Sequence, residues 1–273
     1  DSSMENELQQ LMLLNPQLQI SQDASEYDMP YMNHGDKVLN AQKDVTRVQM
    51  EYLAYFKKNF DYKPLIERLF TDVAYVENNF DVYEFVSRLF KLASNIQSTE
   101  SRHDTSLYNV FTNDELYRLW QVANAWWYLH YGPAPQNGGT QPFSQRYLLK
   151  NIIEKADSAI ALPKPGATLR FGHETMVMPL TCLLGLNGHD RQIADIGQLE
   201  QQGWVNYRIF PMAANIQFVF YRKDSNDKDV LVKVLLNEDE ATLPIASDMA
   251  PLYHWKDVRE YYLKKIADYE KPR

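Results

Sequence analysis

Apolar side chains recur every three or four positions in several separate segments of this chain. This spacing places them on one face of a helix, with polar residues on the other. Residues 2–14 show the pattern and are followed by Asn15 and Pro16, which stop a helix. The same periodicity predicts further helices over residues 44–60, 81–96, 148–156 and 254–267.

Another long helix is predicted to begin at Thr112. The spacing of Thr112 and Glu115 fits a capping box, in which each side chain accepts a hydrogen bond from the backbone N–H of the other residue. The apolar face continues as far as residues 132–142, whose Pro and Gly content predicts a loop. Residues 41–159 are therefore predicted to form a helical domain.

Strand patterns occur on both sides of this helical block. Short or continuous apolar runs predict strands over residues 18–20 and 167–171, and a helix is expected over residues 175–186. Two further apolar runs are joined by the polar residues 223–228 and predict a hairpin, with strands at 215–221 and 230–236. The predicted fold is α/β: a core domain of residues 1–40 and 160–273, interrupted by the helical insertion domain of residues 41–159.

Composition narrows the class of protein. The chain has 273 residues, of which 45% are hydrophobic, and this is enough to bury a substantial core. A formal net charge of -8 argues against a nucleic-acid partner, because polyanion binding needs clustered Lys and Arg. No apolar run approaches the roughly 18 residues of a membrane span. The single Cys182 lies in an apolar stretch and is expected to be a buried thiol.

The strongest candidate for chemistry is the polar sequence Gly172-His173-Glu174-Thr175, at the junction of the predicted strand and helix. In α/β sheets, ligands bind outside the carboxyl ends of strands, where a following helix offers free N–H groups to an anion. A His beside a carboxylate at such a point favours phosphoryl chemistry. A zinc-protease motif is excluded because Val177 stands where its second His would be, and no metal or cofactor is predicted.

This segment resembles the second signature of the histidine acid phosphatases, His-Asp-Thr in many phytases, with Glu in place of Asp. The likeness extends to the multiple inositol polyphosphate phosphatase branch, through residues 111–116, 126–129, 211–215 and 229–236. The resemblance implies a phosphoglycerate-mutase-like α/β layer with a large helical insertion domain. It also implies a phytase-like phosphomonoesterase that acts outside the cytoplasm, in an extracellular or periplasmic location.

The resemblance also assigns roles. His173 would contact the phosphoryl oxygens, and Glu174 would protonate the leaving alkoxide. Thr175 would bind phosphate or substrate hydroxyls, or would act as the helix N-cap. Because Glu is one methylene longer than Asp, its carboxyl must sit differently, and a misplacement of about 1 Å can cost roughly a hundredfold in rate.

The family's Arg-His-Gly-x-Arg-x-Pro element, which carries the nucleophilic His, does not occur in the chain. The nearest strings, Asn33-His34-Gly35 and Arg102-His103-Asp104, each lack part of it. We therefore expect these residues to be the C-terminal part of a phosphatase of inositol polyphosphates, with a missing N-terminal segment of the same protein as partner. The isolated chain is expected to be inactive.

Other interpretations stay open. The chain could be a non-catalytic module that binds a phosphorylated ligand or a partner protein. Lys37, Lys43 and Arg47 could hold distal phosphates, although an ordinary solvated surface is the simpler interpretation. Trp126 could stack on a sugar, as in a carbohydrate-binding protein, although its helical spacing from Trp120 favours core packing.

Overall fold

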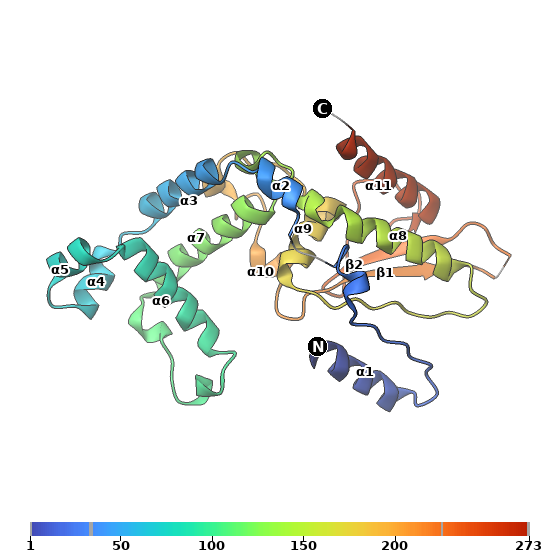
Figure 1. Cartoon of the computed structure of the whole chain (residues 1–273), viewed down its shortest axis with the longest axis horizontal. Coiled ribbons are helices and arrows are strands. Elements are labelled where there is room, and N and C mark those ends of the chain that lie inside the picture. Colours follow the sequence, from blue (N-terminus) through green and yellow to red (C-terminus); the bar gives the residue numbers. More distant parts are fainter. Residues whose placement is uncertain (1, 33–34, 225, 272–273) are drawn as a thin grey trace. The chain divides into compact units, whose positions relative to one another are not determined.

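The computed structural model describes residues 2–32, 35–224 and 226–271. The chain divides into two compact units (Figure 1). Unit 1 consists of Asp1–Gln42, Thr140–Arg191 and Tyr207–Arg273, and unit 2 consists of Lys43–Gly139 and Gln192–Asn206. This division departs from the expected domain boundary, since residues 140–159 belong to unit 1 and residues 192–206 belong to unit 2.

Unit 1 combines a small sheet with helices. Its helices are α1 (Ser2–Leu14), α2 (Lys37–Gln42), α8 (Arg146–Ile160), α9 (Glu174–Leu184) and α11 (Trp255–Glu270). Its strands are β1 (Ile216–Tyr221), β2 (Leu231–Leu236), β3 (Asp239–Glu240) and β4 (Tyr253–His254). A short helix, α10 (Asn206–Ile209), lies where the chain returns from unit 2 to unit 1.

The sheet is antiparallel, with the order β1-β2-β3, and β4 also pairs with β2. The register of the main hairpin runs from Ile216 opposite Leu236 to Tyr221 opposite Leu231, so the predicted hairpin is confirmed. Alternate residues of β2 are buried, as expected for a strand with one face on the core. Figure 1 shows β1 and β2 as the longest strands of unit 1.

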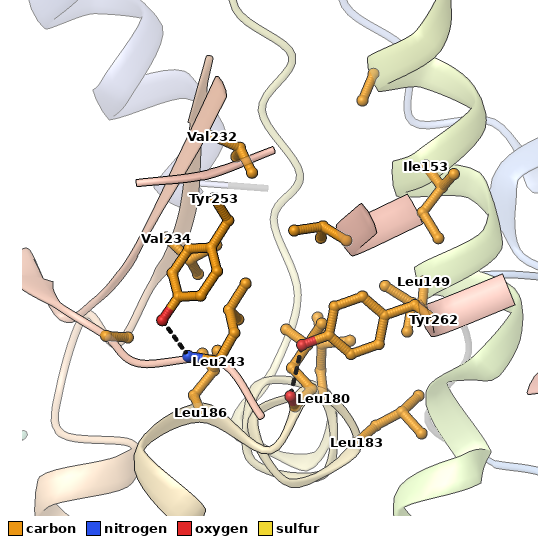
Figure 2. Close-up of a cluster of buried hydrophobic side chains, with 14 of the residues drawn as sticks. Leu149, Ile153, Leu180, Leu183, Leu186, Val232, Val234, Leu243, Tyr253 and Tyr262 are labelled. Atoms are coloured by element: carbon orange, nitrogen blue, oxygen red, sulfur yellow. Dashed lines mark hydrogen bonds between the residues drawn. The ribbon is translucent and has the colours of Figure 1, made fainter. Parts of the chain in front are cut away.

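The core of unit 1 explains why α8 departs from the expected helical domain. Leu149 and Ile153 of α8 are buried in the same cluster as Val232 and Val234 of β2 (Figure 2). Burial of large aliphatic side chains stabilises a fold by about 1.5–3 kcal/mol each. The apolar face of α8 therefore belongs with the sheet, which sequence periodicity alone cannot assign.

Unit 2 is helical. Its helices are α3 (Val45–Asn59), α4 (Lys63–Leu69), α5 (Val73–Asn79), α6 (Val82–Ile96) and α7 (Asn113–Tyr131). The predicted capping box is confirmed: Thr112 Oγ1 accepts from the Glu115 N–H at 3.2 Å, and Glu115 Oε2 accepts from the Thr112 N–H at 2.7 Å. Phe56, Leu65, Ile66 and Val86 are among the residues that form its core.

Two of the predicted strands are wrong. Residues 18–20 and 167–171 form no strand, and neither segment pairs in a ladder with another described part of the chain. A strand persists only where a neighbouring strand satisfies its backbone N–H and C=O groups. The structure remains α/β with a large helical part. No helix within the described ranges is long and apolar enough to cross a membrane.

Candidate functional site at the start of helix α9

His173 is the N-cap of α9, and Glu174 and Thr175 are its first residues. The His173 backbone is extended (φ -116°, ψ 164°), and its carbonyl oxygen accepts from the N–H groups of Met176 (2.9 Å) and Val177 (3.1 Å). The His173 side chain does not cap the helix. The N–H groups of Glu174 and Thr175 have no backbone acceptor among the described residues, so they are available to an anion.

The candidate side chains lie at the surface. His173 and Glu174 are exposed, and Thr175 is half-buried. Within the ranges that the structure describes, no side chain forms a hydrogen bond or ion pair with His173 or Glu174. Neither residue is therefore used in packing the fold. Both can reach a ligand from solvent, while the predicted roles of His173, Glu174 and Thr175 stay predictions.

The rest of α9 is rigidly held. Met176, Met178, Leu180 and Leu183 are buried, so the helix is anchored within one turn of Glu174. Its C-terminal carbonyl groups are also satisfied: the Tyr262 hydroxyl donates to Leu184 O at 2.6 Å (Figure 2) and Lys265 Nζ donates to Leu183 O at 2.7 Å. An exposed start on a buried helix is the arrangement that a preorganised binding site requires.

Gly172 allows the chain to approach this helix closely. A Cβ atom at Gly172 would lie 3.0 Å from Met176 Sδ and 3.7 Å from Met32 Cε. A larger residue would require the Met176 side chain to shift by a few tenths of an ångström. The close contact with Met176 therefore favours a small residue at position 172.

Arg170 is a cation near His173 in sequence that the sequence analysis did not single out. Its Nε and Nη2 atoms donate to Asn151 Oδ1 of α8, at 3.2 Å and 2.7 Å. Burial lowers the pKa of Arg170, and the nearby Tyr31 and Asp28 oppose that shift. Arg170 therefore ties the segment before α9 to α8, three residues before the N-cap.

The basic residues proposed for distal phosphates are not equivalent. Lys43 is half-buried, and its Nζ donates to the His130 carbonyl oxygen at 2.9 Å, near the end of α7. Lys37 and Arg47 are exposed. Lys43 therefore has a structural partner, and the simpler interpretation as a solvated surface fits the other two.

The remaining histidines do not form a second centre. His130 Nδ1 lies 2.8 Å from Trp126 O, and His254 lies between Asp229 and Asp248. His34 lies outside the described residues. Across the described ranges, no three His, Cys, Asp or Glu side chains gather closely enough to hold a metal ion.

Comparison with known proteins places this chain in a family. Residues 12–237 match the histidine phosphatase superfamily (branch 2). Among curated proteins, no relative was found.

Similar solved structures are those of the multiple inositol polyphosphate phosphatase of Bifidobacterium longum. The complex with inositol hexasulfate is 21% identical with a TM-score of 0.57, covering 66% of this chain and 38% of that chain. The phosphate complex gives 21% identity, a TM-score of 0.55, and coverage of 66% and 40%. The apo form gives 17% identity, a TM-score of 0.57, and coverage of 91% and 60%.

These structural likenesses establish a shared fold, and the chain spans less than two thirds of the length of each of those proteins. The family match covers most of the chain, including α9, its N-cap and the main hairpin. The chain therefore belongs to branch 2 of the histidine phosphatase superfamily.

Proposed function

We propose that this chain forms part of a phosphatase that removes phosphate from inositol polyphosphates through a phosphohistidine. The observation that carries the proposal is the exposed His173–Glu174 pair at the start of α9, in a chain of this superfamily. The nucleophilic His would come from outside these 273 residues, since they contain no Arg-His-Gly-x-Arg sequence. We also propose that the protein acts outside the cytoplasm.

The proposed reaction uses the two side chains differently. His173 and the free N–H groups at the start of α9 would hold the phosphoryl oxygens, where helix geometry favours negative charge. Glu174, as the protonated acid, would donate its proton to the leaving alkoxide oxygen. Inositol alkoxides are poor leaving groups, so proton donation is essential to breaking the P–O bond.

The solved relatives support the choice of substrate class. The Bifidobacterium longum enzyme is described with inositol hexasulfate and with phosphate bound, and its fold resembles that of this chain. An inositol polyphosphate is therefore the first substrate to test. Phytate is its most highly phosphorylated common form and the natural choice of probe.

The test compares two substrates in a protein that includes the nucleophile segment. We expect Glu174→Gln to lower kcat on phytate by about 100-fold or more, because general acid catalysis contributes on the order of 10²–10⁴. The same change should matter much less for p-nitrophenyl phosphate, whose leaving group needs no proton. Glu154→Gln, at an exposed position of α8, is the matched control and should leave both rates unchanged.

Each outcome has a clear meaning. Equal losses on the two substrates would remove Glu174 as proton donor and leave it a binding residue. If phytate and other inositol phosphates released no phosphate at all, but the chain bound phosphate and lost that binding in His173→Ala, the protein would be a non-catalytic phosphate-binding module. The absence of the nucleophile sequence from these residues is the observation that keeps this second function in view.

A further inference from the structure

Unit 2 contains a groove between α3 and α6. Its volume is about 520 Å³, which lies within the range of roughly 300–1,000 Å³ that is typical of small-molecule sites. Trp126 of α7 also lines it, so three helices of one unit contribute to its walls. The proposed phosphatase function uses none of the residues that line this groove.

Aromatic rings form the apolar part of the groove. Tyr52, Tyr83 and Trp126 line it and are half-buried, while the buried Phe56 lies behind them. Phe56 and Tyr83 meet edge to face with ring centroids 5.0 Å apart. Rings that are held in this way present a fixed apolar surface and lose little entropy when a ligand binds.

Trp126 is fixed by its own neighbours. Its ring stacks on His130, with centroids 4.4 Å apart and an interplanar angle of 21°, and it meets Trp127 edge to face at 5.2 Å. Burial lowers the pKa of His130 to about 4, so this imidazole is neutral near pH 7. On the groove side, the exposed Lys91 holds its ammonium 5.7 Å from the Trp126 ring centroid and can move aside for a ligand.

The charges of the groove balance. Asp81 and Glu84 line it together with Arg88 and Lys91, and Arg88 is paired with Glu84 at 2.6 Å. A ligand with several phosphates would need an excess of cations, which this groove does not provide. Gln49 and Ser87 add neutral polar groups. The polar lining therefore suits hydroxyl groups, which donate to carboxylates and accept from amide and ammonium groups.

We propose that the groove between α3 and α6 binds a neutral carbohydrate, which would stack on Trp126 and Tyr83 and bond through its hydroxyls to Asp81 and Lys91. A pyranose ring combines an apolar C–H face with a rim of hydroxyls, and the groove offers the complementary pattern. This site does not depend on the proposed phosphatase function. It would give the protein a means of attaching to a glycan.

The test is a calorimetric titration of the 273-residue chain with maltotriose, cellotriose and triacetylchitotriose. We expect at least one to bind with a Kd of about 1 mM or tighter. Trp126→Phe should weaken that binding about fivefold or more, because truncating an aromatic anchor removes stacking area. Trp120→Phe is the matched control on the same helix, since Trp120 does not line the groove, and its affinity should equal that of the unaltered chain.

A second variant protects the test against a folding defect. Asp81 caps α6 by accepting from the Glu84 N–H at 3.0 Å, and Asn caps helices as well as Asp does, so Asp81→Asn keeps the fold and removes the charge. It should also weaken sugar binding. The proposal is overturned if no trisaccharide binds up to about 10 mM, if both variants bind unchanged, or if myo-inositol hexakisphosphate is the only probe that occupies the groove.

Discussion

Asp36→Asn tests whether a buried ion pair holds the segment before α2 against α8. Asp36 pairs with Arg146 of α8, and the two side chains are only 9% and 7% exposed. The same carboxylate caps α2, because Oδ1 accepts from the N–H groups of Val38 (2.9 Å) and Leu39 (3.1 Å). Asparagine keeps the capping oxygen but removes the charge, so the change isolates the ion pair.

The expected loss of stability is about 3 kcal/mol. Removing one partner of a buried pair costs roughly 3–5 kcal/mol, because the other charge is left uncompensated. The lower end applies here because Arg146 keeps a second carboxylate, Glu270 Oε1 at 3.4 Å from Nε, and two neutral acceptors, Phe143 O at 3.0 Å and the Tyr147 hydroxyl at 2.9 Å. Its guanidinium also lies 4.1 Å from the Tyr147 ring centroid.

The pH dependence gives a second signature. Burial by itself favours the neutral acid, but the bonds from Arg146 and from the backbone lower the pKa of Asp36 below its ordinary value of 3.8. A lowered folded-state pKa contributes stability that is present above the unfolded pKa, about 3.9, and is lost as the pH falls below it. The gap between the wild-type chain and Asp36→Asn should therefore be constant near neutral pH and shrink in acid.

The assay is urea unfolding followed by far-UV circular dichroism. Asp44→Asn is the matched control, since Asp44 caps α3 through the Arg47 N–H at 2.9 Å and has no described ion pair. It should lose only a few tenths of a kcal/mol. The double variant Asp36→Asn with Arg146→Met should be more stable than the sum of the single losses implies. Equal losses for Asp36→Asn and Asp44→Asn would refute the reasoning.

Two further predictions use other parts of unit 1 and unit 2. His254 bonds to Asp229 at 2.7 Å, and this bond raises the pKa of His254. The stabilising effect of the pair should therefore be present below about pH 6.5 and lost as the pH rises through the raised pKa. The thermal midpoint of His254→Gln should accordingly fall below that of the wild type at pH 5.5 and match it at pH 9. Gly185→Ala should cost more stability than Gly203→Ala in urea unfolding. Both positions have a positive φ, so alanine at either one is strained by about 1–2 kcal/mol. Only at Gly185 would the new Cβ also meet Asp190, with Oδ2 at 2.9 Å. Equal losses would show that the Asp190 contact is relieved.

Local patterns in the sequence predicted the longer helices and the main hairpin, but not the short helices α2, α4, α5 and α10. The capping box of Thr112 and Glu115 and the alternation of β2 depend on residues close in sequence, and both are confirmed. Pairing between distant segments could not be predicted in the same way. The apolar run 167–171 satisfies every local requirement of a strand, yet no described strand lies beside it.

In the candidate site, too, local features could be predicted from the sequence and long-range contacts could not. The sequence predicted that a helix begins beside Glu174, and the structure starts α9 at that residue. The sequence could not indicate the role of Arg170, because that role depends on hydrogen bonds to Asn151, a residue of helix α8. The groove of unit 2 could not be predicted from the sequence either. The helical spacing of Trp126 is the same whether its ring faces the core or borders a groove.

Helix α9 is anchored in the core of unit 1, whereas its first residues are exposed to solvent. Met176 and the residues from Met178 to Leu184 are buried, and Tyr262 and Lys265 hold the last carbonyl groups of the helix. Only His173 and Glu174 are exposed at its beginning. A phosphate held there would therefore meet N–H groups whose positions are set by the core of unit 1, so little ordering entropy is lost on binding. No described residue bonds to the Glu174 carboxyl, so the fold of unit 1 fixes the helix start without fixing this side chain. For this reason the Glu174 variants, more than those of the helix, decide its role as proton donor.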